Sequence, residues 1–304
     1  MKPCVATVGT FDGFHIGHRA IINKVTETAR EKGLESRGIT FINHPLTVVA
    51  PEKAPKWALP RSGSVHALEY SLDKVSEMNF TPELASLKAA DFMKLIKERF
   101  NVVTLVMGYD NTFGSDRLST KDEYERAGRE AGIEVVFVDA VNTSDGKPAS
   151  SSRLRKAVAD WDIRLIFELL KSYPMYSGPV EKGKQLGRRI GFPTMNVGLD
   201  DDIVAIPDGV YAAEVLLDDE DEGRPAVVSI GSNPTVEGSK RTVEVHVANE
   251  KLPNMYGETV FFLLLDKIRD IKKFDSVAEL KQAIKADIAK MYKILDEAEI
   301  VEDL

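Results

Sequence analysis

The sequence predicts an α/β domain with a parallel sheet, followed by an all-β part that forms an antiparallel barrel or sandwich and ends in a helix. Three observations predict this order. Short β-branched runs alternate with helical patterns in the first half, closely spaced strand-like runs follow after about residue 166, and a length of 304 residues favours two domains. The segment 171–180 contains two prolines and is expected to be a linker, so we expect domains at 1–172 and 177–304.

In the first half, strands are expected at 4–8, 38–42, 101–107 and 133–141, and helices at 17–32, 82–99 and 120–131. Gly33 and Gly132 follow two of these helices, as left-handed caps do. Residues 43–61 contain four prolines and no clear period, and they are expected to form a long loop. Strand–helix–strand alternation predicts parallel strands joined by right-handed crossovers.

In the second half, strand-like runs occupy 210–217, 225–232, 242–249 and 259–268, with turn-type segments such as 218–223 and 233–238 between them. The last helix opens with Ser276 and Glu279, which have the spacing of a capping box. Its apolar stripe is expected to pack on the barrel and consists of Val277, Leu280, Ile284, Ile288, Met291 and Leu295.

Composition excludes several classes of protein. Forty basic residues minus 48 acidic residues leave a net charge of −8, which disfavours nucleic-acid binding because that needs a basic face. Cys4 is the only cysteine, which excludes a disulfide framework and a thiolate metal cluster. No apolar run is long enough to span a membrane, and the first residues lack the apolar core of a signal peptide. We therefore expect a soluble, cytoplasmic protein.

The segment Gly9-Thr10-Phe11-Asp12-Gly13-Phe14-His15-Ile16-Gly17-His18 joins the first expected strand to the first helix. Ligands bind at the carboxyl ends of strands in open α/β sheets. A glycine-rich turn before a helix presents backbone N–H groups and a partial positive charge, which suit a phosphate. Two imidazoles three residues apart can also donate hydrogen bonds to an α-phosphate as charge develops in a transition state.

Two other interpretations compete for His15 and His18, namely ordinary surface or capping histidines and two ligands of a metal. A zinc site needs at least a third ligand, and no other histidine or cysteine nearby has ligand spacing. The Gly-Thr-Phe-Asp-Gly prefix is hard to explain for a chance pair of histidines, so it favours phosphate chemistry.

Polar clusters also follow the other expected strands, at 43–45, 108–114 and 150–155. In the last cluster, Ser150, Ser151 and Ser152 could simply cap a helix, and an arginine beside them could be a solvated charge. Arg153 and Arg155 could instead grip a polyphosphate. Four polar clusters at one edge of one sheet favour the second interpretation.

HxGH after a Gly-Thr-Phe-Asp-Gly turn, with a later SSxxxR element, resembles the nucleotidyltransferase superfamily, and in detail the bacterial bifunctional riboflavin kinase/FMN adenylyltransferases. The resemblance implies a Rossmann-like domain that transfers AMP from ATP to FMN. It implies that His15 and His18 contact the ATP phosphates and that His44 and Asp110 lie near the flavin or nucleotide. The remaining residues that it assigns to ATP are Gly9, Thr10, Phe11, Asp12, Gly17, Ser151, Ser152 and Arg155.

Three positions depart from that family's pattern. Asn43 replaces the first proline of Pro-His-Pro, Asn111 replaces the phenylalanine of Asp-Phe, and residues 59–70 lack a matching lysine. These changes concern the flavin pocket more than the ATP site.

The second half carries its own phosphate signal. Gly183, Gly187 and Arg188 belong to a glycine- and arginine-rich loop, which suits a phosphate in an acidic chain, although a flexible hairpin with solvated charges is the alternative. The hydroxyl of Thr194 and the side-chain carbonyl of Asn196 follow within Gly-Phe-Pro-Thr-Met-Asn. Such hard oxygen donors suit Mg²⁺, which completes its shell with water and phosphates.

Glu244 lies in an expected alternating strand, on the same face as His246. It could form a cross-strand ion pair with a partner such as Arg241. It could also be a general base that takes the proton from an alcohol attacking a γ-phosphate.

Residues 178–196, which read GxVxxGxxxGRxxGFPTxN, resemble the riboflavin kinase module together with the segments 207–211, 230–235, 243–246, 256–258 and 268–274. The resemblance implies a six-stranded Greek-key barrel with a C-terminal helix. It implies that Thr194 and Asn196 bind Mg²⁺ and ATP phosphate, and that Glu244 activates the riboflavin 5′-hydroxyl. Residues 247–257 depart from the family's acidic stretch, so the rim is expected to differ.

The expected function is therefore two consecutive reactions, with ATP and Mg²⁺ serving both. The C-terminal domain would phosphorylate riboflavin to FMN, and the N-terminal domain would convert FMN and ATP to FAD and pyrophosphate. The alternatives are a riboflavin kinase alone and an N-terminal module that binds flavin or nucleotide without turnover. In each case the partners are small molecules.

Overall fold

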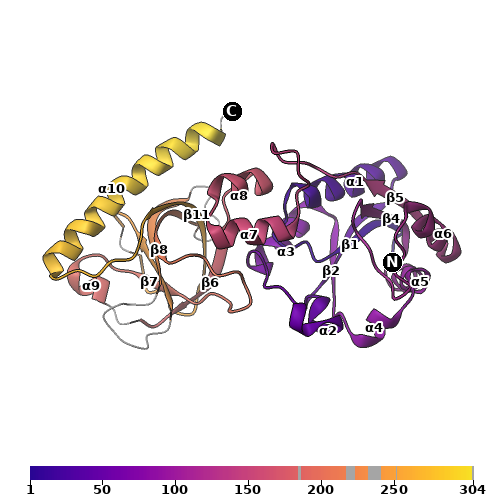
Figure 1. Ribbon diagram of the computed structural model, residues 1–304, viewed down its shortest axis with the longest axis horizontal. Helices are drawn as coiled ribbons and strands as arrows, with labels where there is room; N and C mark the ends of the chain where they lie inside the picture. The colour runs from indigo at the N-terminus through magenta and orange to yellow at the C-terminus, as the bar shows by residue number, and fades with distance from the viewer. Residues whose placement is uncertain (184–185, 217–222, 232–240, 251, 303–304) are drawn as a thin grey trace. The chain divides into compact units, whose positions relative to one another are not determined.

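The structure is a computed structural model that describes all residues except 184–185, 217–222, 232–240, 251 and 303–304 (Figure 1). Its contacts divide the chain into two compact units, Met1–Trp57 with Arg61–Arg153 and Ala58–Pro60 with Leu154–Leu304. The expected turns at 218–223 and 233–238 lie outside the described residues, apart from Gly223.

The first unit contains a five-stranded parallel sheet, as the sequence predicts for its class. Its strands, in spatial order, are β3 (Lys74–Met78), β2 (Glu35–Phe41), β1 (Cys4–Gly9), β4 (Val102–Gly108) and β5 (Glu134–Val138). Its helices are α1 (Ile16–Lys32), α2 (Leu46–Val49), the 3₁₀ turn η1 (Pro51–Lys53), α3 (Arg61–Ser71), α4 (Pro82–Ser86), α5 (Ala89–Phe100) and α6 (Lys121–Ala131). The central position of β1 places its carboxyl end, Gly9, between the ends of β2 and β4.

Helices cover both faces of this sheet, so the unit has three layers (Figure 1). On one face, α1 and α3 pack through residues such as Ile22 and Leu68 against Val5 of β1. On the other face, α5 and α6 pack against Ala6 and Leu105. Neighbouring residues of β1 point to opposite faces, which explains why its run of buried residues is continuous.

Several predicted elements of this unit need correction. β3 and α3 were not predicted. β3 is a half-exposed edge strand that contains lysine, serine and glutamate and only two apolar residues, so it has no apolar pattern that predicts a strand. The expected loop at 43–61 contains α2 and η1. The expected helix at 82–99 is two helices, because Leu87 and Lys88 are extended. Two hydrogen bonds fix this break between the helices. Ser115 N–H donates to the Leu87 carbonyl, and Ala89 N–H donates to Asp116 Oδ1.

The second unit contains a closed barrel of six antiparallel strands. In spatial order they are β10 (Thr242–Val247), β7 (Met195–Val197), β6 (Met175–Glu181), β11 (Thr259–Arg269), β8 (Gly209–Leu216) and β9 (Arg224–Gly231). The segment expected to be a linker contains β6, so that prediction is wrong. Pro179 is tolerated near the end of β6, where its carbonyl accepts from Gly198 N–H.

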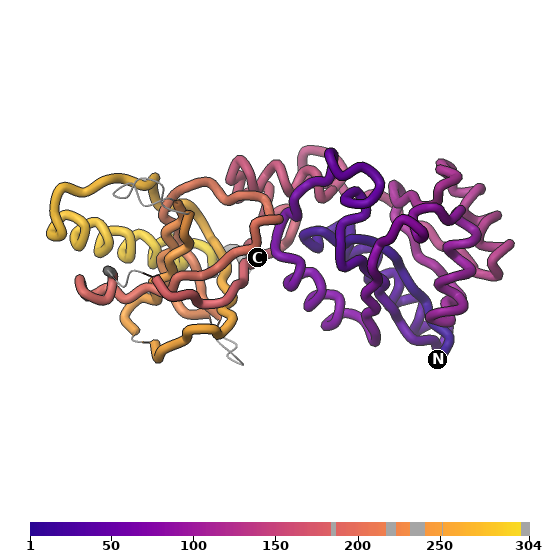
Figure 2. Tube along the Cα trace, turned by 90° about the horizontal axis from the view of Figure 1, so that it is seen from below, coloured from indigo at the N-terminus to yellow at the C-terminus, as the bar shows by residue number. Residues whose placement is uncertain are grey.

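The helices outside the sheet and barrel are α7 (Ser151–Asp160), α8 (Ile163–Leu170), α9 (Leu186–Ile190) and α10 (Val277–Glu302). As predicted, Ser276 accepts a hydrogen bond from Glu279 N–H at the start of α10. α10 lies beside the barrel strands (Figures 1 and 2), and Met291 and Leu295 pack against Val210. Val277 is an exception in the predicted stripe, because more than half of its surface is exposed. No helix in the described part of the chain has the length and apolar character to cross a bilayer.

Candidate active sites

The first candidate site is built on the turn between β1 and α1. Phe11, Gly13 and Phe14 have φ values of 48°, 78° and 49°, so three of the four residues before His15 adopt the left-handed conformation. Such backbone strain persists where surrounding contacts fix it. Here Phe11 is buried and packs edge-on to the His18 ring, with the ring centroids 5.4 Å apart.

His15 and His18 stack on each other, with ring centroids 3.8 Å apart and an interplanar angle of 20°. His15 occupies the N-cap position of α1 but makes no side-chain cap hydrogen bond. Ser151 Oγ, at the start of α7, lies 3.5 Å from His15 Nε2 and donates to the Asp12 carbonyl at 3.0 Å. Because the His15 side chain makes no cap hydrogen bond, it does not act as the N-cap of α1, and its Nε2 faces Ser151 instead.

Burial lowers the pKa of His18 well below its usual value, and the neighbouring His15 lowers it further. His18 is therefore neutral at physiological pH and can offer a hydrogen bond, but not a full charge, to a phosphate. Its Nδ1 is buried without a partner among the described residues. The described chain also contains no group of three or more His, Cys, Asp or Glu side chains able to hold a metal ion, so nothing in it completes a zinc site around the two histidines.

This pKa shift predicts a pH dependence of stability. Because the unfolded state binds a proton near pH 6.5 and buried His18 does not, its contribution to stability is complete above pH 6.5 and declines as the pH falls below it. We expect the melting temperature of the native chain to fall between pH 6.5 and 5 more steeply than that of His18→Asn. Thermal melts of both proteins across this range measure the difference, and parallel curves would contradict it.

The strand ends surround a cavity of about 290 Å³. Eight predicted site residues line it, namely Gly9, Thr10, Phe11, His15, Gly17, His18, Asp110 and Ser151. Four others lie outside this lining, namely Asp12, His44, Ser152 and Arg155. Asp12 still contributes its carbonyl to Ser151, whereas His44 accepts from Leu46 N–H and packs edge-on to Trp57.

The cavity also contains residues that were not predicted. Asp139 directly follows β5, so the rule that ligands meet strand ends could have found it. Asn111 belongs to the predicted polar cluster 108–114 but was not predicted as a site residue. It lines the cavity and donates from Nδ2 to the Val8 carbonyl at 2.9 Å. Asn43 exchanges two hydrogen bonds with the backbone of Phe80. Asn111 thus connects the segment after β4 to β1, and Asn43 connects the segments that follow β2 and β3. Both sets of hydrogen bonds lie at the carboxyl edge of the sheet.

The second candidate site lies where β7 and β10 pair. Asn196 and Glu244 are direct partners across these strands, and Thr194 Oγ1 donates to Glu244 Oε2 at 3.4 Å. The predicted ion pair is not formed, because Arg241 pairs with Asp208 at 2.9 Å. A hydroxyl, an amide and a carboxylate are therefore gathered at one place.

The glycines of the preceding loop make this approach possible. A Cβ atom on Gly183 would lie 2.1 Å from Asn196 Nδ2, and one on Gly187 would lie 2.2 Å from the Phe192 carbonyl oxygen. Gly187 also accepts a hydrogen bond from Phe192 N–H. Gly187 therefore requires glycine because a side chain would collide with the Phe192 backbone, and it lies in helix α9 rather than in the loop that the sequence predicts. A side chain at Gly183 would displace the Asn196 side chain.

A cavity of about 500 Å³ opens beside this cluster, and Gly187, Thr194, Asn196 and Glu244 line it. His246 shares this wall with Glu244, as the predicted alternation requires, and its Nδ1 lies 2.8 Å from the Pro193 carbonyl oxygen. A smaller cavity of about 100 Å³ is lined by Arg188 and again by Thr194. Thr194 therefore borders both spaces.

Arg269 and Asp287 also line the larger cavity and were not predicted. They form a two-pronged ion pair between β11 and α10, with both N–O distances 2.8 Å. Arg269 also lies over the Phe274 ring. The pair fixes the 270–276 connection, which forms one wall of the cavity.

We expect Asp287→Ala to destabilise the second unit by about 3 kcal/mol, because Arg269 would lose its partner while remaining mostly buried. Urea unfolding followed by circular dichroism measures this effect. Asp270→Ala is the matched control, since Asp270 pairs with Lys267 at the surface, where an ion pair contributes little. Equal effects of the two substitutions would show that burial of the Arg269–Asp287 pair is unimportant.

Comparisons with known proteins agree with this division into two sites. A family model described as FAD synthetase matches residues 1–153, and one described as riboflavin kinase matches residues 170–295. Relatives named bifunctional riboflavin kinase/FMN adenylyltransferase are 35% identical in Escherichia coli K12 and 36% identical in Pseudomonas fluorescens. These alignments cover 93% and 95% of this chain and 90% and 92% of the relatives.

A solved structure described as a macrolide-efflux protein from Streptococcus pneumoniae is also similar, with a TM-score of 0.80 and 31% identity over 94% of this chain and 92% of that chain. The similarity therefore extends over residues of both units of this chain. With both family models and both long alignments matching, this chain belongs to the family of bifunctional riboflavin kinase/FMN adenylyltransferases.

Proposed function

We propose that this chain phosphorylates riboflavin to FMN and then adenylylates FMN to FAD. The observation that carries the proposal is the presence of two separate cavities, one around the stacked histidines and one around Thr194, Asn196 and Glu244. We assign adenylyl transfer to residues 1–172 and phosphorylation to residues 177–304. The family matches at 1–153 and 170–295 support this assignment. We also propose that the protein acts in the cytoplasm, where ATP is available for both steps.

In adenylyl transfer, a phosphate oxygen of FMN attacks the α-phosphorus of ATP, and the bond to the pyrophosphate oxygen breaks. His15 and His18 donate hydrogen bonds to the phosphates as negative charge develops. The turn 9–12, Gly17 and the α1 N-terminus hold the nucleotide phosphates through backbone N–H groups. We assign Ser151 to the triphosphate and Asp110 to the flavin, since both line the cavity. The resemblance also assigns Ser152 and Arg155 to the triphosphate and His44 to the flavin, although these three residues lie outside the cavity lining.

In phosphorylation, the riboflavin 5′-hydroxyl attacks the γ-phosphorus of ATP and ADP leaves. Glu244 accepts the hydroxyl proton, and the 500 Å³ cavity, with its aromatic and aliphatic lining, receives the flavin. The smaller cavity of about 100 Å³ beside Arg188 can receive only part of the nucleotide, and Thr194, on the border of both cavities, would lie near the transferred phosphate. Gly183 and Gly187 allow the phosphates to approach the backbone.

The residues at this border fit a magnesium ion. Thr194 and Asn196 offer neutral oxygen donors next to the Glu244 carboxylate, and Mg²⁺ takes few protein ligands when phosphates complete its shell. Thr194 and Asn196 would hold the ion, which neutralises phosphate charge when bound. The same ion class would accompany ATP in the first site.

The test is incubation of the whole chain with riboflavin, ATP and Mg²⁺, with FMN, FAD and pyrophosphate resolved over time. We expect FMN to appear first and FAD to follow with an equal amount of pyrophosphate. FMN without FAD would favour the alternative, a riboflavin kinase whose N-terminal unit binds nucleotide or flavin without turnover. Absence of both products would overturn the proposal.

A further inference from the structure

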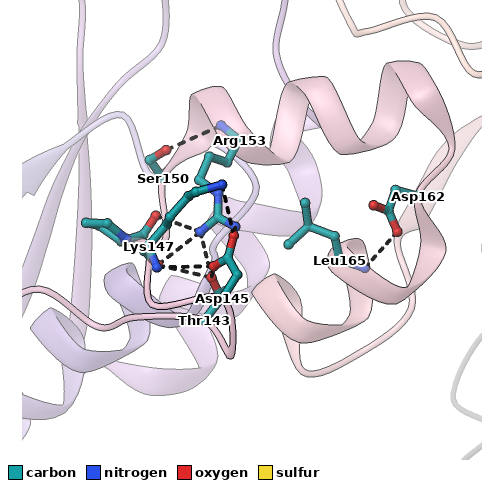
Figure 3. Close-up of polar contacts among 8 residues, drawn as sticks. Thr143, Asp145, Lys147, Ser150, Arg153, Asp162 and Leu165 are labelled. Carbon is teal, nitrogen blue, oxygen red and sulfur yellow. Dashed lines mark hydrogen bonds and ion pairs between the residues drawn. The ribbon is translucent and has the colours of Figure 1, made fainter.

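A short turn, whose polar contacts Figure 3 shows, connects β5 to α7. Residues on both sides of it line the adenylyl-transfer cavity. Asn142 and Pro148 form an isolated antiparallel bridge, and Thr143 N–H donates to the Lys147 carbonyl at 3.0 Å. Just outside this bridge, Ala149 N–H donates to the Val141 carbonyl at 2.8 Å. The turn therefore brings residues 141 and 149 side by side.

Arg153 reaches back from the first turn of α7 and closes this turn (Figure 3). One terminal nitrogen donates to Thr143 Oγ1 at 2.6 Å and to the carbonyls of Lys147 and Pro148 at 3.0 Å each. The other terminal nitrogen donates to Asp145 Oδ2 at 2.9 Å. A planar guanidinium can satisfy four such acceptors at once, which a lysine cannot do with the same geometry.

Asp145 completes the network. It accepts from Thr143 Oγ1 at 2.6 Å and from Lys147 N–H at 3.1 Å. These hydrogen bonds, and then the charge of Arg153, lower the pKa of Asp145 to about 2. The network is therefore fully charged across the pH range in which an enzyme assay is run.

Both arms of the turn line the cavity, through Val141 on one side and Ala149, Ser150 and Ser151 on the other. Arg153 itself lies outside the lining. Its backbone N–H donates to Ser150 Oγ at 3.3 Å, so the same residue also fixes the start of α7.

Ser151, which follows Ser150, connects the start of α7 to the pair of histidines. Ser151 Oγ donates to the Asp12 carbonyl, which leaves the oxygen as an acceptor 3.5 Å from His15 Nε2. A displaced turn would move Ser151, and with it the group that faces the first histidine. Displacement of reacting groups by about 1 Å can cost about 10²-fold in rate.

We propose that Arg153 is a positioning residue for adenylyl transfer, which holds the 143–148 turn and thereby sets Ser151 against His15. Its guanidinium is occupied by the turn and does not bind the triphosphate. This inference rests on the adenylyl transfer proposed above, and it gives Arg153 a role different from that of Arg155, two residues further along the same helix.

The test compares FAD formation from FMN and ATP in the native chain, Arg153→Ala, Arg153→Lys and Asp145→Ala. We expect kcat to fall about 10- to 100-fold in Arg153→Ala while KM for ATP changes less than threefold, because a misplaced group lowers the rate without removing a ligand. Arg153→Lys should recover part of the rate. In the double variant Arg153→Ala/Asp145→Ala, kcat should fall no further than in Arg153→Ala, since the two side chains act as one unit.

Two controls accompany these variants. Lys156→Ala removes an exposed cation that pairs with Asp160 on the same helix, and it should leave kcat unchanged. Circular dichroism melts of every variant report whether the unit that contains Arg153 remains folded, and riboflavin phosphorylation serves as the activity that should not change. If Arg153→Ala does not fold, Asp145→Ala decides by the same criterion.

The inference is overturned if Arg153→Ala keeps kcat within threefold of the native value. It is also overturned if the loss appears as a large increase in KM for ATP, which would make Arg153 a ligand of the substrate. A native chain that forms no FAD refutes adenylyl transfer itself, so that failure is distinguishable from failure of the positioning role.

Discussion

His18→Ala is expected to lower the rate of FAD formation from FMN and ATP by about 10²- to 10³-fold and to leave riboflavin phosphorylation unchanged. The reason is that His18 lines the first cavity, stacks on His15 and offers a neutral donor from a half-buried ring. A preorganised donor in such a place stabilises developing phosphate charge without reorganisation. Initial rates of FAD and FMN formation by one preparation measure both effects.

Removal of the half-buried His18 ring can also loosen the packing around Phe11, so a second variant is needed. His18→Asn retains a hydrogen-bonding side chain of smaller size and should recover part of the rate. His66→Ala is the control, because His66 is exposed on α3. Full activity of His18→Ala would refute a catalytic role for the histidine pair.

The period of apolar residues was sufficient to predict the helices and strands that bury a continuous apolar face. α1 spans Ile16–Lys32, one residue longer than the expected helix at 17–32. As expected, Gly33 and Gly132 follow the last residues of α1 and α6 as left-handed caps. β3 and β6 were missed for a different reason. Their residues pair with strands that are distant in the sequence, so neither the polar β3 nor the proline-containing β6 has a pattern of its own that predicts a strand.

The candidate sites were also predictable only where their residues are close together in the sequence. The turn 9–18 and the Thr194–Asn196 pair were predictable, because each chemical group lies within one short segment. The Arg269–Asp287 pair joins residues from a strand and a helix, and no local spacing connects them. Likewise, the residue pattern alone offered both Arg153 and Arg155 for phosphate, and the family resemblance assigned only Arg155. The role of Arg153 emerges only from its contacts with the 143–148 turn.

Glu244→Gln is expected to lower the rate of riboflavin phosphorylation by about 10²- to 10⁴-fold, the contribution of a well-placed general base. Glutamine keeps the size of the side chain and can still pack beside Thr194, but it cannot accept the proton of the attacking hydroxyl. The measurement is FMN formation from riboflavin and ATP at saturating Mg²⁺. Glu258→Gln, at an exposed position of the same unit, is the control and should retain full activity.

The same variant also tests the separation of the two sites. When FMN is supplied directly, Glu244→Gln should form FAD at the native rate, because Glu244 lines a cavity built entirely from the second unit. Phosphorylation within threefold of the native rate would remove Glu244 as the base. Loss of both activities in a folded Glu244→Gln protein would instead mean that one site depends on the other, since no residue of the adenylyl-transfer cavity belongs to the barrel.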